Sequence, residues 1–324
     1  MSERLVEEEL MRLGQSGVML PRLGLGAWAW GDRIMWGYGR EYGPTEVRGA
    51  FEASLAAGIA FIDTAEMYGG GNSERLLGTF MQEASRVAFR NERRPIVATK
   101  FMPLPWRWRK NSLIQALRRS LGRLRLKQVD LYQIHWPFPP RAIETWVEAL
   151  ADTVDAGLAR AVGVSNFSVD QMRRAHDVLS RRGIPLASNQ VEYSLLQRAP
   201  ERSGLLAACR GLGVTLIAYS PIAKGLLSGK YTPRNPPPGI RGWRYNAGRL
   251  KALQPLIEVL REVGQARGKT PAQVALNWTM CKGALPIPGA KNAQQAEENA
   301  GALGWRLSDE EVARLDEVSR GVRL

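Results

Sequence analysis

Short apolar segments alternate with longer amphipathic segments along most of the chain. Apolar runs of this length, rich in β-branched and aromatic residues, are typical of strands that are buried on both faces. We therefore predict eight strands, most of them followed by a helix. They cover Leu23–Trp28, Ala60–Asp63, Pro95–Lys100, Val129–His135, Ala159–Val164, Ser188–Val191, Val214–Tyr219 and Ala284–Ile287.

The segments between these strands have the spacing of amphipathic helices. Thr270 followed by Pro271 indicates the start of a further helix, because threonine is a good N-cap and proline fits the first turn. Gly58 and Gly157 stand where helices should end. The predicted helices are Thr45–Ala57, Ser73–Gln82, Ser112–Leu124, Ala142–Ala156, Val169–Arg181, Glu201–Gly211 and Leu250–Arg267.

Strands that alternate with helices indicate a parallel sheet, and eight strands is the number that closes into a barrel. An open doubly wound sheet is the rival, but it usually carries a GxGxxG turn. Neither "GLGAWAWG" nor "GYGREYG" gives that motif before a helix, and no GxxxxGK[ST] is present. We therefore predict an α/β fold: one (β/α)8 TIM barrel domain over residues 1–324, with a short N-terminal extension and an extra C-terminal helix.

One Pro-rich segment interrupts this alternation. Thr232–Trp243, "TPRNPPPGIRGW", lies between the seventh strand and the next helix. Two interpretations stay open for it: a plain surface loop, or a lid over the mouth of the barrel.

Composition and charge change this picture little. The 324 residues are 44% hydrophobic and 23% charged, which is ordinary for a globular protein. A net charge of +14 would suit a polyanionic partner, but the basic residues are spread along the chain. We interpret them as a solvated surface and expect no nucleic-acid and no membrane partner. The two cysteines form no CxxC, and no signal-peptide pattern is present, so we expect a reducing cytoplasm.

Three successive predicted strands end on titratable residues. Asp63 ends "IAFID", Lys100 ends "PIVATK" and His135 ends "VDLYQIH". In a barrel the carboxyl ends of neighbouring strands meet at one mouth, where catalytic groups lie. A charged side chain that loses its water there needs a partner. One such residue is easily explained by packing, whereas three together predict an active site.

Tyr68 follows the second of these strands and should lie at the same mouth. A tyrosine has a pKa near 10, and an adjacent ammonium such as that of Lys100 lowers it. Asp63 can hold Lys100, and His135 can orient a substrate oxygen. This set suits protonation of a carbonyl oxygen while a nicotinamide cofactor delivers hydride.

Competing chemistries find less in the sequence. The chain has two histidines, no HExxH and no cysteine cluster, so we predict no metal site. A serine nucleophile is disfavoured because no GxSxG is present.

The segment "KFMPLPWRWRK" after the third strand interleaves tryptophans with basic residues. Its alternatives are a surface rim, an apolar wall of the substrate pocket, or a platform for nucleic-acid bases. Further aromatic residues stand at or beyond strand ends and favour a flat apolar pocket. The candidate pocket residues are Trp28, Trp30, Tyr68, Trp106, Trp108, His135, Trp136 and Phe167.

With these residues in place, the chain resembles the aldo-keto reductases. Asp63, Tyr68, Lys100 and His135 look like the catalytic tetrad of that family. The blocks "GLGAW", "FIDTAEMYG", "GVSNFS", "NQVEYS", "AYSPIAKGLLSGKY" and "PIPGAKNAQQAEEN" occur in the family's order. The pattern is most similar to bacterial, cyanobacterial and plastid members, pyridoxal reductases and potassium-channel β subunits. The resemblance implies a small-molecule carbonyl substrate, with Tyr68 as proton donor.

The resemblance also implies extended binding of NADP(H) by a barrel without a Rossmann fold. Many members place an arginine where Gln295 stands, so Lys291 would supply the charge for a 2′-phosphate, with Arg241 or Arg244 as further candidates. NADP(H) is the preferred cofactor and NAD(H) the alternative. The implied cofactor residues are Gly26, Ala27, Trp28, Asp63, Ser165, Asn166, Gln190, Tyr219, Ser220, Pro221, Ile222, Gly225, Leu226, Lys230, Gly289, Lys291, Gln295, Glu298 and Asn299.

Two functions from different classes follow. The first is NADPH-dependent reduction of aldehydes or ketones, with pyridoxal as one candidate substrate by resemblance. The alternative is a cofactor-binding regulatory subunit whose slow catalysis reports redox state, as the similarity to channel β subunits implies. The sequence makes no prediction of oligomeric state.

Overall fold

A computed structural model describes residues 10–87, 94–139, 141–238 and 245–322. All eight predicted strands are confirmed, and they form one sheet in which every neighbouring pair is parallel. In chain order they are β3 (Leu25–Gly26), β4 (Phe61–Asp63), β5 (Ile96–Phe101), β6 (Val129–Ile134), β7 (Ala159–Ser165), β8 (Leu186–Glu192), β9 (Thr215–Tyr219) and β10 (Leu285–Ile287).

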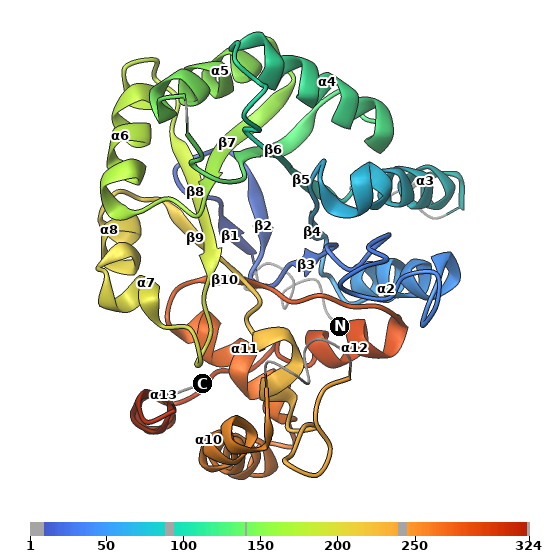
Figure 1. Cartoon of the computed structure of the whole chain (residues 1–324), viewed down its shortest axis with the longest axis vertical. Coiled ribbons are helices and arrows are strands. Elements are labelled where there is room, and N and C mark those ends of the chain that lie inside the picture. The colour runs from blue at the N-terminus through green and yellow to red at the C-terminus, as the bar shows by residue number, and fades with distance from the viewer. Residues whose placement is uncertain (1–9, 88–93, 140, 239–244, 323–324) are drawn as a thin grey trace.

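The first and last strands of this sheet meet and close it into a barrel. The amide of Gly24 donates to the carbonyl of Pro286 at 3.0 Å, and that of Gly26 donates to Pro288 at 2.9 Å. Figure 1 shows the strands as an inner ring with the helices outside. The (β/α)8 barrel is therefore confirmed, and the open doubly wound sheet is excluded.

Most predicted helices lie within a few residues of their expected bounds. The predicted helix Glu201–Gly211 is wrong as a single element, because Gly204 has a φ of 75° and splits it in two. Thr270 caps its helix as predicted, by accepting from the Gln273 amide. The helices are α2 (Pro44–Ala56), α3 (Asn72–Val87), α4 (Asn111–Leu124), α5 (Ile143–Asp155), α6 (Val169–Ser180), α7 (Ala199–Arg202), α8 (Leu205–Gly211), α10 (Ala247–Gln265), α11 (Pro271–Cys281), α12 (Ala293–Ala300) and α13 (Asp309–Arg320).

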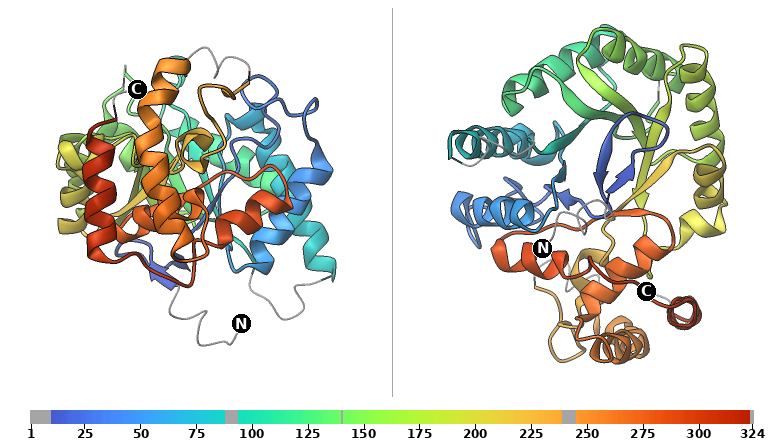
Figure 2. Two further views of the ribbon diagram at one scale, coloured as in Figure 1. Left: turned by 90° about the horizontal axis from the view of Figure 1, so that it is seen from below. Right: turned by 180° about the vertical axis from the view of Figure 1, so that it is seen from behind.

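A hairpin that the strand pattern did not predict covers one end of the barrel. It consists of β1 (Leu10–Arg12) and β2 (Met19–Pro21), each three residues long. Leu13, Val18 and Leu20 are buried against the inward-facing residues of the barrel strands. Figure 2 shows the hairpin across the barrel opening, so the site must lie at the other end, where the strands terminate.

The long segment after β9 begins with a short 3-10 helix, η2 (Ala223–Ser228). The Pro-rich segment follows it, and its residues 239–243 lie outside the described residues. Arg241 and Arg244 also lie outside them. The lid therefore stays a prediction. Within the part of the chain that is described, no helix is long and apolar enough to span a bilayer.

Candidate active site

Asp63, Lys100 and His135 come from three adjacent strands, as the sequence predicted. Asp63 is the last residue of β4, Lys100 lies near the end of β5, and His135 directly follows β6. Register in the parallel sheet places Lys100 beside Gln133 of β6. Because these strand ends meet, side chains from three elements converge at one point.

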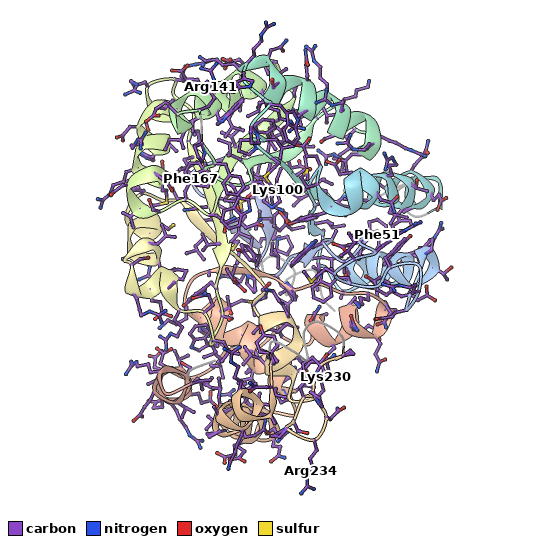
Figure 3. All side chains as sticks on the ribbon, in the orientation of Figure 1. Phe51, Lys100, Arg141, Phe167, Lys230 and Arg234 are labelled. Carbon is purple, nitrogen blue, oxygen red and sulfur yellow. The ribbon has the colours of Figure 1, made fainter. Side chains whose placement is uncertain are left out.

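Lys100 is the centre of this cluster. Its side chain is fully buried and forms an ion pair with Asp63, which is also buried. The same Nζ donates to the carbonyl oxygen of Thr64 at 3.0 Å and lies 3.1 Å from the hydroxyl oxygen of Tyr68. All three donor positions of the ammonium are therefore used, and each holds a different neighbour in place. Figure 3 places Lys100 near the centre of the barrel.

Two glutamines complete the environment of Asp63. Its Oδ1 accepts from Nε2 of Gln133 at 3.2 Å and from Nε2 of Gln190 at 2.8 Å. Gln133 is fully buried, and sequence reasoning missed it. The available signal was a polar residue inside an apolar strand, since a buried amide requires hydrogen-bond partners.

Burial and charge act in opposite directions on Tyr68 and Lys100. Burial raises the pKa of Tyr68, and the Lys100 ammonium acts against it without reversing it. Lys100 therefore acts in the expected sense, but the expected net lowering of the Tyr68 pKa is wrong, because removal from water outweighs it. Burial would lower the pKa of Lys100, yet the Asp63 charge and the bonds to Asp63 and Tyr68 leave it raised. Tyr68 thus stays protonated beside a charged ammonium.

His135 is held as a neutral imidazole. Burial, helped by repulsion from Lys100, lowers its pKa from 6.5 to about 3. Its ring lies edge-on to Tyr68, with the ring centroids 5.7 Å apart. Its Nδ1 is buried without a hydrogen-bond partner among the described residues. A neutral imidazole next to Tyr68 carries one N–H group, which can orient a carbonyl oxygen by donating a hydrogen bond to it.

These groups lie in a cavity of about 640 Å³. That volume is in the range of sites for cofactors and small ligands. Most of the cofactor residues implied by the resemblance line it. They are Gly26, Trp28, Asp63, Ser165, Asn166, Gln190, Tyr219, Ser220, Pro221, Ile222, Gly225, Lys230, Gly289, Lys291, Gln295, Glu298 and Asn299.

Several predicted site residues do not line the cavity. Ala27 and Leu226 are buried in the core instead. Trp30 is fully buried, packs against Phe80 and donates to the carbonyl of Ala290, so its assignment to the substrate pocket is wrong.

Three more aromatic predictions for the pocket also need correction. Trp106 is 72% exposed, Trp108 is 52% exposed, and both lie outside the cavity lining, because their loop turns them toward solvent. Phe167 is buried away from the cavity. Trp28 and Trp136 do line it, as predicted.

Sequence reasoning missed two residues of the cavity wall, Trp36 in the loop after β3 and Met67 in the turn after β4. Trp36 lines the cavity and stacks edge-to-face on Trp28, with the ring centroids 5.5 Å apart. Met67, directly before Tyr68, contributes an apolar side chain. Trp36 follows no strand directly, so only the path of the loop brings it to the mouth.

The polar groups of the cavity fit a nicotinamide dinucleotide. The Asn166 amide accepts from the Tyr219 hydroxyl at 3.1 Å and donates to the His135 carbonyl at 3.1 Å. Asn166 and Ser220 have left-handed φ angles of 62° and 51°, which are uncommon for non-glycine residues and often mark functional sites. The buried, unpartnered His135 Nδ1 also indicates a polar ligand nearby.

The far end of the cavity carries a lysine and a glutamine. The Lys291 side chain donates to the Trp36 carbonyl at 2.9 Å and lies over the ring of Tyr42, 4.5 Å from its centroid. The Lys291 amide donates to Oε1 of Gln295 at 2.9 Å. Lys291 thus joins the loop after β3 to the start of α12. Within the described residues, no three His, Cys, Asp or Glu side chains are placed to hold a metal ion.

Known proteins resemble this chain over most of its length. The Aldo/keto reductase family pattern matches residues 22–320. Pyridoxal reductase, chloroplastic, of Arabidopsis thaliana is 40% identical, over 92% of this chain and 83% of that protein. L-glyceraldehyde 3-phosphate reductase of Escherichia coli K12 is 31% identical, over 97% and 93%. The crystal structure of a Bombyx mori aldo-keto reductase in complex with NADP covers 97% of this chain and 94% of its own, with 26% identity and a TM-score of 0.75.

Proposed function

The chain belongs to the aldo/keto reductase family and is an oxidoreductase that acts on carbonyl compounds, and from this premise we propose that it reduces aldehydes or ketones to alcohols with NADPH and with Tyr68 as proton donor. The observation that carries the proposal is the 3.1 Å contact between the Tyr68 hydroxyl oxygen and Lys100 Nζ, in one cavity with His135.

Each residue has a distinct task in this reaction. His135 orients the substrate oxygen toward Tyr68, and its neutral state leaves the proton transfer to the phenol. Tyr68 donates its hydroxyl proton to that oxygen, and Lys100 stabilises the phenolate that remains. Asp63 keeps the ammonium in place and compensates its burial. NADPH, when bound, supplies the hydride for the carbonyl carbon.

The cofactor would extend from the catalytic cluster along the ends of β7 to β10. In this proposal Asn166 and Ser165, which line the cavity, would supply the donors and acceptors that a carboxamide needs, and Tyr219 would offer a flat ring. Lys291 places a positive charge at the far end of the cavity. This charge favours the phosphorylated cofactor NADPH over NADH. We therefore put NADPH first and NADH second.

For the substrate we propose planar carbonyl compounds. Trp28, Trp36 and Trp136 give the cavity flat apolar walls beside Tyr68. Pyridoxal is a candidate, because the Arabidopsis relative at 40% identity is named as a reductase of it. The name of that relative also refers to the chloroplast, whereas cytoplasmic localisation of this chain stays a prediction.

The test is a panel of carbonyl compounds with NADPH and with NADH, including pyridoxal, nitrobenzaldehydes and methylglyoxal. Tyr68→Phe should abolish turnover and leave NADPH affinity nearly intact, because it removes only the hydroxyl. Undiminished turnover in Tyr68→Phe would contradict the assignment of Tyr68 as the proton donor. Negligible turnover of the wild type across the panel, with copurifying nucleotide, would favour the regulatory alternative.

A further inference from the structure

In the loop after β5, Arg107 turns inward between two exposed tryptophans. Trp106 is 72% exposed and Trp108 is 52% exposed, whereas the Arg107 side chain between them is only 16% exposed. We propose that Arg107 is a positioning residue for the reaction and that, through its ion pair with Glu66, it fixes the turn that carries Tyr68. This inference rests on the proposed function, because it assumes that Tyr68 donates the proton.

Arg107 and Glu66 meet in a two-pronged contact. Nη1 of Arg107 pairs with Oε1 of Glu66 at 2.5 Å, and Nη2 pairs with Oε2 at 3.1 Å. The amide of Met102 also donates to Oε1 of Glu66 at 2.8 Å. Paired N–H···O bonds of this kind fix orientation as well as distance, which a single lysine contact does not.

The pair is buried, so both partners need each other. The Glu66 side chain is 6% exposed, and the Met102 amide is its other polar contact in the described structure. Removing Arg107 leaves a buried carboxylate without its counter-charge, and the turn would move to expose it to water. An exposed surface pair would have no such consequence.

Glu66 lies in the turn that leads from Asp63 to Tyr68. The amide of Glu66 donates to the carbonyl of Lys100 at 3.4 Å, which is a weak contact. The amide of Tyr68 donates to Ala65 at 3.1 Å. Because the backbone contact at Glu66 is long, its side chain supplies the firmer attachment between this turn and the loop after β5.

Arg107 also contacts the strand that carries Lys100. Its guanidinium lies over the ring of Phe101, 4.9 Å from the centroid, and Nη1 donates to the Met102 carbonyl at 2.9 Å. Phe101 is the neighbour of Lys100 in β5. Arg107 therefore touches both segments, the one that bears the proton donor and the one that bears the ammonium. Its role is to hold the Tyr68–Lys100 distance.

The expected effect is on the rate and not on cofactor binding. Neither Glu66 nor Arg107 lines the cavity. Misplacement of a reacting group by about 1 Å costs about 100-fold in rate. We expect Arg107→Gln to lower kcat by about 10- to 100-fold, with NADPH affinity within about twofold of wild type. Arg107→Lys keeps the positive charge but not the paired hydrogen bonds, so its kcat should lie between those of wild type and Arg107→Gln.

The experiment compares Arg107→Gln and Arg107→Lys with Arg109→Gln, an exposed arginine two residues away in the same loop. Steady-state kcat, NADPH affinity and thermal unfolding are measured for each. Hydrogen exchange of the cofactor-free protein should show faster exchange over residues 64–72 in Arg107→Gln and unchanged exchange in Arg109→Gln. That readout does not depend on activity.

Tyr68→Phe in the same assay separates two failures. If Tyr68→Phe keeps its turnover, the proposed function fails. If Tyr68→Phe is inactive while folded Arg107→Gln has wild-type kcat and exchange, the positioning role is overturned. An equal loss in Arg109→Gln would overturn it as well. If Arg107→Gln does not fold, the kcat and hydrogen exchange of Arg107→Lys test the positioning role in the same way.

Discussion

Lys100 Nζ lies 3.1 Å from the Tyr68 hydroxyl oxygen, and the same ammonium forms a buried ion pair with Asp63. One charge thus serves two partners of different kinds. Asp63 holds the ammonium in a position from which water is excluded, and the positive charge of Lys100 acts on the Tyr68 hydroxyl. Both stability and catalysis should respond when this charge is removed.

Replacing Lys100 with Met should lower kcat by about 10²- to 10⁴-fold, because the phenolate left after proton donation loses its stabilising charge. The same substitution leaves the buried Asp63 carboxylate without its counter-charge, so the free energy of unfolding should fall by about 3–5 kcal/mol. Steady-state assays at neutral pH and urea denaturation measure the two effects.

Lys110→Met is the matched control for that substitution. Lys110 pairs with Glu148, but its side chain is 47% exposed. Pairs in water contribute little, so activity and stability should stay near wild type. If Lys110→Met loses as much as Lys100→Met, the Lys100 charge has no special role.

His135 should make the protein less stable in acid. Its pKa in the folded chain is about 3, against 6.5 in the unfolded chain. Between these values the unfolded chain binds one more proton here. The free energy of unfolding therefore keeps its full value above pH 6.5. It decreases as the pH falls from 6.5 toward 3, by about 1.4 kcal/mol per pH unit.

Urea denaturation of wild type and His135→Gln between pH 7 and pH 4 measures that slope. The stability difference between the two proteins should change with pH by up to about 1.4 kcal/mol per unit. His176→Gln removes the chain's other histidine, on α6, and is the control. Identical pH dependence in both variants would contradict the assignment of this effect to His135.

The barrel was predictable because its strands are short, apolar and separated by capped helices. Asp63, Lys100 and His135 lie at or next to the carboxyl ends of three neighbouring strands, so the topology alone brings them together. The hairpin β1–β2 was not predictable, because it lies before the alternation of strands and helices by which the barrel strands were recognised. Tertiary packing against the barrel interior stabilises it instead.

The missed parts of the site depend on loops. Trp36 reaches the cavity, whereas Trp106 turns to solvent, although both are tryptophans in segments after strands. No local pattern distinguishes them, since loop paths depend on distant contacts such as Lys291 with the Trp36 carbonyl. Trp30 shows the same limit, because its indole binds the carbonyl of Ala290, far along the chain.

Cofactor preference should follow the charge at the far end of the cavity. Lys291→Met should weaken NADPH binding by about tenfold, equivalent to about 1.4 kcal/mol, and change NADH binding little. Gln295→Arg should shift the preference toward NADPH, because a guanidinium binds a phosphate through paired hydrogen bonds. Fluorescence titration with each cofactor measures the dissociation constants.

Lys251→Met, at an exposed position on α10, controls for the loss of one positive charge from the surface. Its NADPH affinity should stay within about twofold of wild type, because a solvated charge at a distance is screened by salt. Equal weakening of NADPH and NADH in Lys291→Met would mean that Lys291 supports the wall around Trp36 rather than a phosphate.

Two adjacent glycines after Tyr68 should respond differently to the same substitution. Gly69 and Gly70 have φ angles of 56° and 64°, so alanine at either position costs about 1–2 kcal/mol in backbone strain. A methyl group on Gly69 would also lie 2.5 Å from the carbonyl oxygen of Gly31, whereas one on Gly70 would meet nothing within 4 Å.

Gly69→Ala must therefore move the turn that bears Tyr68 or the loop after β3, and the kcat of Gly69→Ala should fall well below that of Gly70→Ala. Kinetics and thermal unfolding of both variants measure this, and equal kcat values would show that Tyr68 tolerates movement of its turn.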